Sequence, residues 1–169
     1  YRHIEDPYID FNREKLIPYK ISDRGPAVAV GDLNGDGKDD VYLGGSKFIA
    51  SKTYLAQDST YVEKKWPTLA QDSVKEIIDA QIADFNGDGS NDIFLTAGGG
   101  DFFGASPALL DSYFLAKDST FTKQSLPEIY QNSSVVRAQD FDDDGDLDVF
   151  IGGHTLTSIF GAPASSHLL

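Results

Sequence analysis

The segment AVAVGDLNGDGKDDVYLGG, residues 27–45, recurs in the chain as two further similar copies, and this repeat indicates the fold. The second copy is DAQIADFNGDGSNDIFLTAG, residues 79–98, and the third is VVRAQDFDDDGDLDVFIGG, residues 135–153. The leading aspartates, Asp32, Asp84 and Asp140, lie 52 and 56 residues apart. A repeat of nearly constant length indicates one supersecondary unit that recurs and buries its apolar surface against its neighbours.

The similarity between the units extends beyond the acidic segment. YLAQDSTY, residues 54–61, recurs as FLAKDSTF, residues 114–121. We predict strands at 27–31, 41–44, 53–57 and 61–65 in the first unit, and at 80–83, 93–97, 112–116 and 121–125 in the second. Four short strands in a unit of this length are typical of a β-propeller blade.

The apolar pattern supports stacked blades. Apolar residues alternate in the first strand of each unit, whereas residues 41–43, 93–95 and 149–151 are apolar throughout. A strand that is apolar on both faces must be covered on both faces, and neighbouring blades provide that cover. The sequence therefore predicts an all-β protein made of blades of four antiparallel strands.

We expect four segments along the chain. Residues 1–20 form the end of a preceding blade or a closing strand, because residues 9–18 resemble the end of a unit. Residues 21–78 and 79–134 form two blades, and residues 135–169 form a partial blade. Because closed propellers have about 4–8 blades, this count predicts an incomplete propeller fragment. The alternative is a small domain with a swapped or irregular end.

Each unit carries candidate ligand residues at positions 1, 3, 5, 7 and 9 of an acidic loop, with side-chain oxygens at positions 1, 3, 5 and 9. They are Asp32, Asn34, Asp36, Lys38 and Asp40, then Asp84, Asn86, Asp88, Ser90 and Asp92, and finally Asp140, Asp142, Asp144, Asp146 and Asp148. Ca²⁺ takes 6–8 oxygen ligands from carboxylates, amides, carbonyls and water. Position 7 can offer its backbone carbonyl, so a lysine is acceptable there, and the glycine at position 6 permits a sharp turn.

The pattern favours up to three Ca²⁺ ions, one in each loop. An EF-hand would need Glu at position 12, where this chain has Leu43, Leu95 and Ile151 in β-rich runs. Mg²⁺ prefers to keep its waters, and zinc sites use Cys or clustered His, whereas this chain has no Cys. Ordinary Asp/Asn/Gly turns without metal are the alternative. Loop two has neutral Asn86 and Ser90, so we expect it to bind Ca²⁺ more weakly than loop three.

These motifs resemble the FG-GAP/VCBS repeat of integrin α-subunit propellers and of many bacterial exported proteins. The acidic loops DLNGDGKDD, DFNGDGSND and DFDDDGDLD carry the resemblance, and their flanks resemble the cartilage-acidic-protein-like branch on bacterial surfaces. The resemblance implies a calcium loop between the first two strands of each blade. It leaves the biological role open, because such repeats occur in adhesins, receptors, uptake accessories and noncatalytic parts of enzymes.

Composition excludes several functions. The net charge is −13, which argues against binding to nucleic acid or to an anionic membrane surface. The chain has 22 Asp but only 5 Glu, and Asp is the residue that bonds turns or hard cations. No apolar run is long enough for a membrane span. Because no nucleophile or base has a recognisable partner in the sequence, we predict a noncatalytic chain.

The second unit has an insertion that the first unit lacks, around residues 99–110, with Phe102 and Phe103. Exposed aromatic residues on a loop often mark a contact surface, so we treat these two as candidates for partner binding. The alternative is that the loop folds them back onto its own blade.

The sequence thus favours a noncatalytic, calcium-binding propeller segment of a secreted or cell-surface protein that binds a protein or glycan partner. Two alternatives remain at this point. The chain could be an accessory region of a propeller-fold lyase or hydrolase with its active site elsewhere. It could also be a subunit of an outer-membrane uptake or secretion complex.

Overall fold

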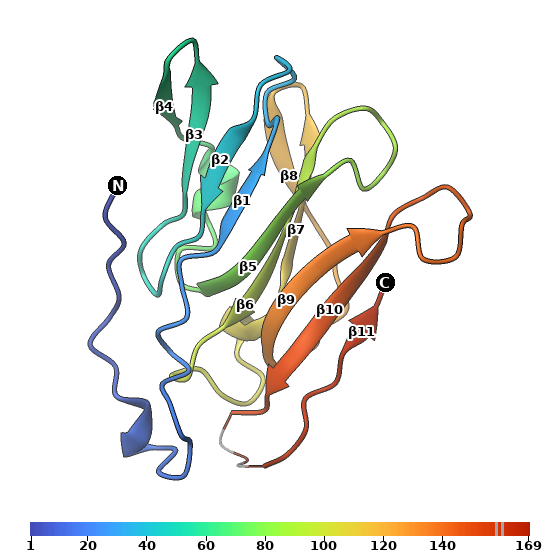
Figure 1. Cartoon of the computed structure of the whole chain (residues 1–169). Coiled ribbons are helices and arrows are strands. Elements are labelled where there is room, and N and C mark those ends of the chain that lie inside the picture. Colours follow the sequence, from blue (N-terminus) through green and yellow to red (C-terminus); the bar gives the residue numbers. More distant parts are fainter. Residues whose placement is uncertain (158, 160) are drawn as a thin grey trace.

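The computed structural model describes residues 1–157, 159 and 161–169 and contains three antiparallel sheets (Figure 1). The first sheet contains β1 (Val28–Gly31), β2 (Asp40–Leu43), β3 (Lys52–Gln57) and β4 (Thr60–Lys64), and the second contains β5 (Glu76–Ala83), β6 (Asp92–Gly98), β7 (Ser112–Lys117) and β8 (Thr120–Gln124). The third contains β9 (Asn132–Gln139), β10 (Asp148–Thr155) and β11 (His167–Leu168), in the order β11-β10-β9. Short helical turns are η1 (Asp10–Asn12), α1 (Pro67–Ala70) and η2 (Pro107–Leu109).

Each sheet is a meander in which sequential strands pair, as expected for propeller blades. The β3–β4 and β7–β8 hairpins turn tightly, with Gln57 opposite Thr60 and Lys117 opposite Thr120. The turn residue Asp118 has a positive φ of 50°, a conformation that Asp tolerates better than most residues. All eight strands predicted for the first two units are present. The strand β5 begins earlier than predicted, at Glu76, because it continues through a bulge between Ile77 and Asp79.

The first two blades share one core. Ala29 and Tyr42 of the first blade pack in the same buried cluster as Ile93 and Phe114 of the second. Gly31 makes the close approach possible, because a Cβ there would lie 2.7 Å from Cγ2 of Ile82.

A second buried cluster joins the second blade to the third. It contains Phe94 of β6 together with Val136, Val149 and Ile151 of β9 and β10. The core therefore lies between sheets rather than inside one sheet, which is the packing expected of blades.

The outermost blade faces are uncovered. Val28 and Val30 are 53% and 56% exposed, although the equivalent Ala80 of β5 is buried. At the other end of the stack Phe141 is 50% exposed and Phe150 is 36% exposed. In β1, therefore, only the face that carries Ala29 is buried, and the face that carries Val28 and Val30 is exposed. Among the described residues the sheets do not close into a ring, so the fold is an incomplete propeller fragment, as predicted.

Residues 1–27 form no strand in this structure; the only regular element there is the turn η1. Residues 9–18 therefore form no closing strand in this structure, and the link of residues 1–20 to a preceding blade stays a prediction. The segment is held by side chains instead. Ser46 Oγ donates to the Ile4 carbonyl at 2.5 Å, and Ser22 Oγ donates to Asp10 Oδ2 at 2.5 Å. Figure 1 shows η1 at the end of the molecule opposite the β1–β2 loop.

Candidate metal centres

The three acidic loops occupy equivalent places in the three sheets. They join β1 to β2, β5 to β6 and β9 to β10 (Figure 1). Loop one turns through Gly35 and Gly37, whose φ values are 75° and 80°. Loop three has Asp143 where loop one has Gly35, and its φ is also positive, at 61°. The left-handed conformation at positions 4 and 6 is thus a shared property of the loop.

The aspartate at position 1 organises each loop by accepting backbone amides. Asp32 accepts from Gly35 and Gly37, both at 2.7 Å. Asp84 accepts from Gly89 at 2.8 Å, and Asp140 accepts from Gly145 at 3.0 Å; these glycines occupy the same position 6 as Gly37. Burial alone would raise the pKa of Asp32, but the amides of residues 34–37 outweigh it, so the pKa is lowered.

Positions 3 and 5 are linked through an asparagine amide in the first two loops. Asn34 Nδ2 donates to Asp36 Oδ2 at 3.2 Å, and Asn86 Nδ2 donates to Asp88 Oδ2 at 3.0 Å. The bond from Asn86, with the amide of Ser90, lowers the pKa of Asp88. The oxygen-bearing residues at positions 3 and 5 therefore lie side by side in both loops.

Position 7 contributes its backbone in all three loops. The amides of Lys38, Ser90 and Asp146 donate to the position-5 carboxylate of their own loop at 2.9, 2.9 and 3.1 Å. The ammonium group of Lys38 is directed elsewhere, 4.0 Å from a carboxylate oxygen of Asp58 in the β3–β4 turn. A lysine is therefore compatible with this position, as the sequence predicts.

Position 9 has a structural role that the sequence did not reveal. Asp40 is fully buried, and its two oxygens accept the amides of Leu33 at 2.8 Å and Ala56 at 2.9 Å. In the second blade Asp92 accepts the amide of Ala116 at 2.7 Å, and burial raises its pKa. This aspartate therefore fastens the loop to the third strand of the blade. The donors are backbone amides, which no side-chain pattern could have indicated.

Loop three has the most carboxylates. Oxygens of Asp140, Asp142 and Asp148 all lie within 4.8 Å of one another. Asp148 accepts the amide of Phe141 at 2.9 Å, the counterpart of the bond from Leu33 to Asp40. The side-chain bond to Asp144 and the repulsion from that carboxylate raise the pKa of Asp146. Such crowding of like charges is unfavourable unless a cation or a proton compensates it.

The donor set fits a hard divalent cation. Each loop offers carboxylate, amide and carbonyl oxygens, and a carboxylate that already accepts one amide on each oxygen keeps further lone pairs for a metal. All fifteen predicted ligand residues lie in the three loops or at the first residue of the following strand. Which ion they bind, and whether they bind one, stays a prediction.

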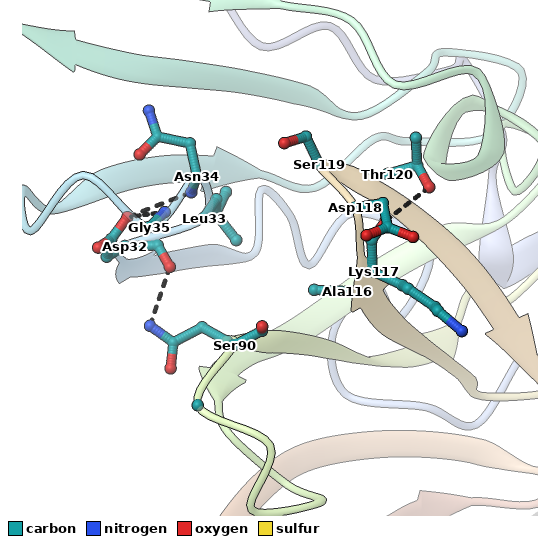
Figure 2. A pocket seen from close by; sticks show the side chains of 12 residues that line it. Asp32, Leu33, Asn34, Gly35, Ser90, Ala116, Lys117, Asp118, Ser119 and Thr120 are labelled. Carbon is teal, nitrogen blue, oxygen red and sulfur yellow. Dashed lines mark hydrogen bonds between the residues drawn. The ribbon is translucent and has the colours of Figure 1, made fainter.

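A polar cleft of about 250 Å³ separates loop one from the second blade. Figure 2 shows Asp32 and Asn34 on one side, Ser90 of loop two below, and the β7–β8 turn with Asp118 and Ser119 on the other side. Asn91, beside Ser90, donates its Nδ2 hydrogen to the Asp32 carbonyl at 2.9 Å. This contact joins two loops that are far apart in sequence.

The insertion predicted to carry a partner site packs partly against its own chain. Phe102 is half-buried with Lys47 Nζ 5.4 Å from its ring centre, whereas Phe103 is 61% exposed with the Arg13 guanidinium 5.1 Å away. The structure therefore folds one aromatic ring back and leaves the other accessible. A role for these two residues in partner binding stays a prediction.

Taken together, the stacked antiparallel sheets and the loops define an incomplete β-propeller with one acidic loop per blade. Residues 84–151 match the family described as FG-GAP-like repeat, and residues 24–48 match FG-GAP repeat. The chain is therefore an FG-GAP-repeat protein. No curated protein matches the chain. FG-GAP repeats are typically noncatalytic, often mediate protein interactions and usually occur in extracellular or surface proteins.

Within the described part of the chain, no helix has the length and apolar character that a membrane crossing requires.

Proposed function

We propose that the three acidic loops bind Ca²⁺ and that the ions stabilise one end of a noncatalytic propeller segment. The observation that carries this proposal is the close approach of Asp140, Asp142 and Asp148, whose oxygens lie within 4.8 Å of one another. The same positions recur in the other two loops with Asn in place of one Asp. Three matching oxygen sets between equivalent strands are more than turn formation requires.

When bound, Ca²⁺ would supply a positive charge that several carboxylates share. Positions 1, 3, 5 and 9 would offer side-chain oxygens, and Lys38, Ser90 and Asp146 would offer backbone carbonyls. The aspartates at position 9 already fasten the loops to the third strands through Ala56 and Ala116. Binding would therefore stiffen the blade as well as the loop.

We further propose that the segment lies outside the cytoplasm, in a secreted or cell-surface protein, and binds a protein partner. Extracellular calcium modules bind with dissociation constants of about 10⁻⁴–10⁻³ M, so such sites fill outside the cell. The general occurrence of FG-GAP repeats in surface proteins supports this location. Phe103 is the exposed residue that favours a partner surface on the insertion.

The test is a thermal melt of the chain with and without a calcium chelator. We expect the midpoint to fall on chelation and to recover with Ca²⁺ but not with equimolar Mg²⁺. A variant with Asn at all three position-5 aspartates, Asp36, Asp88 and Asp144, should lose the response. Asp58→Asn, in the exposed β3–β4 turn, is the matched control and should keep it. A chelator response that is absent in the unmodified chain would contradict the proposal.

A further inference from the structure

One peptide group lies between two of the acidic loops. The Asp32 carbonyl accepts a hydrogen bond from Asn91 Nδ2 at 2.9 Å, and the amide on the other side of the same peptide, that of Leu33, donates to Asp40 at 2.8 Å. The peptide thus joins position 8 of loop two to position 9 of loop one. It also follows directly on position 1, the aspartate that accepts the amides of Gly35 and Gly37.

The linking residue is well placed to respond to its own loop. Asn91 lies between Ser90, whose carbonyl is a predicted ligand, and Asp92, which is fully buried and fastened to Ala116. An ion in loop two would fix the residues on both sides of Asn91. The freedom of its side chain would fall, and the bond to Asp32 would form more often.

The third loop lacks this connection. Position 8 of loop three is Leu147, whose side chain has no donor for the carbonyl of Asp84. Position 8 of loop one is Asp39, which is exposed. Loops one and two are therefore linked by a side-chain hydrogen bond from position 8. Loops two and three provide a comparison within the same chain, because Leu147 cannot make the equivalent bond.

We propose that Ca²⁺ binding to loops one and two is positively cooperative through Asn91, whereas loop three binds independently. This inference rests on the proposed function, because it requires that the loops bind Ca²⁺. One hydrogen bond that forms more fully in the doubly bound state gives a coupling of about two- to tenfold in affinity. Linkage makes the effect reciprocal, so each of the two loops should raise the affinity of the other by the same factor.

Three glycine amides allow each loop to be followed separately by ¹H–¹⁵N NMR during a calcium titration. Gly37 donates to Asp32 at 2.7 Å, Gly89 to Asp84 at 2.8 Å and Gly145 to Asp140 at 3.0 Å. Each amide therefore reports the position-1 ligand of its own loop. Its midpoint gives the apparent affinity of that loop.

The experiment is a double-mutant cycle. Asp88→Ala, which disables loop two, should weaken binding at Gly37 by about two- to tenfold and leave Gly145 unchanged. In the Asn91→Leu background, which copies the residue of loop three, Asp88→Ala should no longer affect Gly37. The reciprocal variant Leu147→Asn should create coupling between loops two and three. Asp39→Leu, at the same position of loop one, is the control and should change no coupling.

The outcomes separate the two claims. If no glycine amide responds to Ca²⁺, the proposed function fails. If all three respond but Asp88→Ala leaves the Gly37 midpoint unchanged, the loops bind independently and the cooperative link is wrong. A melt in chelator shows whether Asn91→Leu is folded; if it is not, Asn91→Ala takes its place, and the Leu147→Asn gain of coupling decides the question in either case.

Discussion

The first and third acidic loops have the same ligand spacing but are held together by different contacts. In loop one the side-chain amide of Asn34 donates to Asp36. The same loop has a glycine at position 4, and its position-9 residue, Asp40, is fully buried. Loop three has carboxylates at the first two of these positions, Asp142 and Asp143, and its position-9 residue Asp148 is only partly buried. Loop one therefore has neutral residues at positions 3 and 4, and a hydrogen bond links position 3 to position 5. Loop three has carboxylates at positions 3 and 4, so it carries more negative charge.

These contacts indicate which loops depend on an ion for their shape. In loops one and two the amide of Asn34 or Asn86 donates to the neighbouring aspartate. The position-9 carboxylate accepts two backbone amides in loop one, and in loop two it accepts the Ala116 amide and the Tyr113 hydroxyl. Loop three has six aspartates within nine residues and a left-handed Asp143. We therefore expect loop three to be the loop whose geometry Ca²⁺ orders most.

The largest expected effect distinguishes the two position-9 aspartates. Asp40→Ala would leave the amides of Leu33 and Ala56 without partners, at a cost of about 2–4 kcal/mol in the free energy of unfolding. Asp148→Ala removes one comparable bond, to Phe141, at a less buried site and should cost less than half as much. Urea unfolding in chelator measures both. Equal losses would remove the structural distinction between the loops.

Asp111 lies between the second and third blades, and its titration contributes to the pH dependence of stability in addition to the titration of the acidic loops. Burial raises the pKa of Asp111 to about 6, although it accepts bonds from the Ala97 amide and the Ser133 hydroxyl. Its folded-state pKa lies above the unfolded value of about 3.9, so its protonated form stabilises the fold and this contribution is lost as pH rises from about 4 to 6.

Asp111→Asn tests this assignment, because the amide keeps an acceptor for Ala97 and cannot ionise. The variant should gain about 1–2 kcal/mol relative to the unmodified chain between pH 4.5 and 7.5. Urea unfolding at the two pH values measures the difference. A stability difference that does not change with pH would show that Asp111 is not the titrating group.

The third position sets the charge of the loop. Asp142→Asn copies loops one and two and should weaken Ca²⁺ binding to loop three about tenfold, because one ligand charge is lost. In chelator the same variant should melt at a slightly higher temperature, since repulsion is relieved. Asn86→Asp should strengthen Ca²⁺ binding to loop two and lower the melting temperature in chelator. Calorimetric titration and melts measure them; equal signs in the two variants would refute the role of charge.

The smallest expected effect concerns the backbone at position 4. Asp143 has a φ of 61° where loops one and two have glycine. Asp143→Gly should therefore stabilise the calcium-free chain by about 0.5–1 kcal/mol, the relief of left-handed strain less the added freedom of the unfolded glycine. Gly87→Ala should be destabilising by a similar amount. Urea unfolding of both variants is the measurement, and a destabilised Asp143→Gly would contradict the interpretation.

Much of this molecule could be predicted from the three copies of one motif. The repeat located the strands to within a few residues, because apolar runs such as residues 93–95 have to be covered on both faces. The sequence did not predict the start of β5, because the bulge between Ile77 and Asp79 interrupts the pairing without a recognisable change in the apolar pattern. Residues 9–18 form no strand, and contacts such as the bond from the Ser22 hydroxyl to Asp10, which the sequence does not reveal, hold this segment instead of strand pairing.

The candidate sites were predictable in part for a similar reason. Ligand positions follow from residue type and spacing, so all fifteen lie in the loops as expected. The bond from the Ala56 amide to Asp40 and the bond from Asn91 to the Asp32 carbonyl involve backbone groups 16 and 59 residues away. Such groups are present at every residue, and only the packing of the blades determines which of them come into contact.

Anomalous X-ray scattering from crystals grown with Ca²⁺ would show whether each acidic loop holds a Ca²⁺ ion. We expect one peak in each loop, about 2.3–2.6 Å from the oxygens at positions 1, 3 and 5, with the highest occupancy beside Asp140 and Asp142. Loops that show no peak in saturating Ca²⁺ would contradict this expectation.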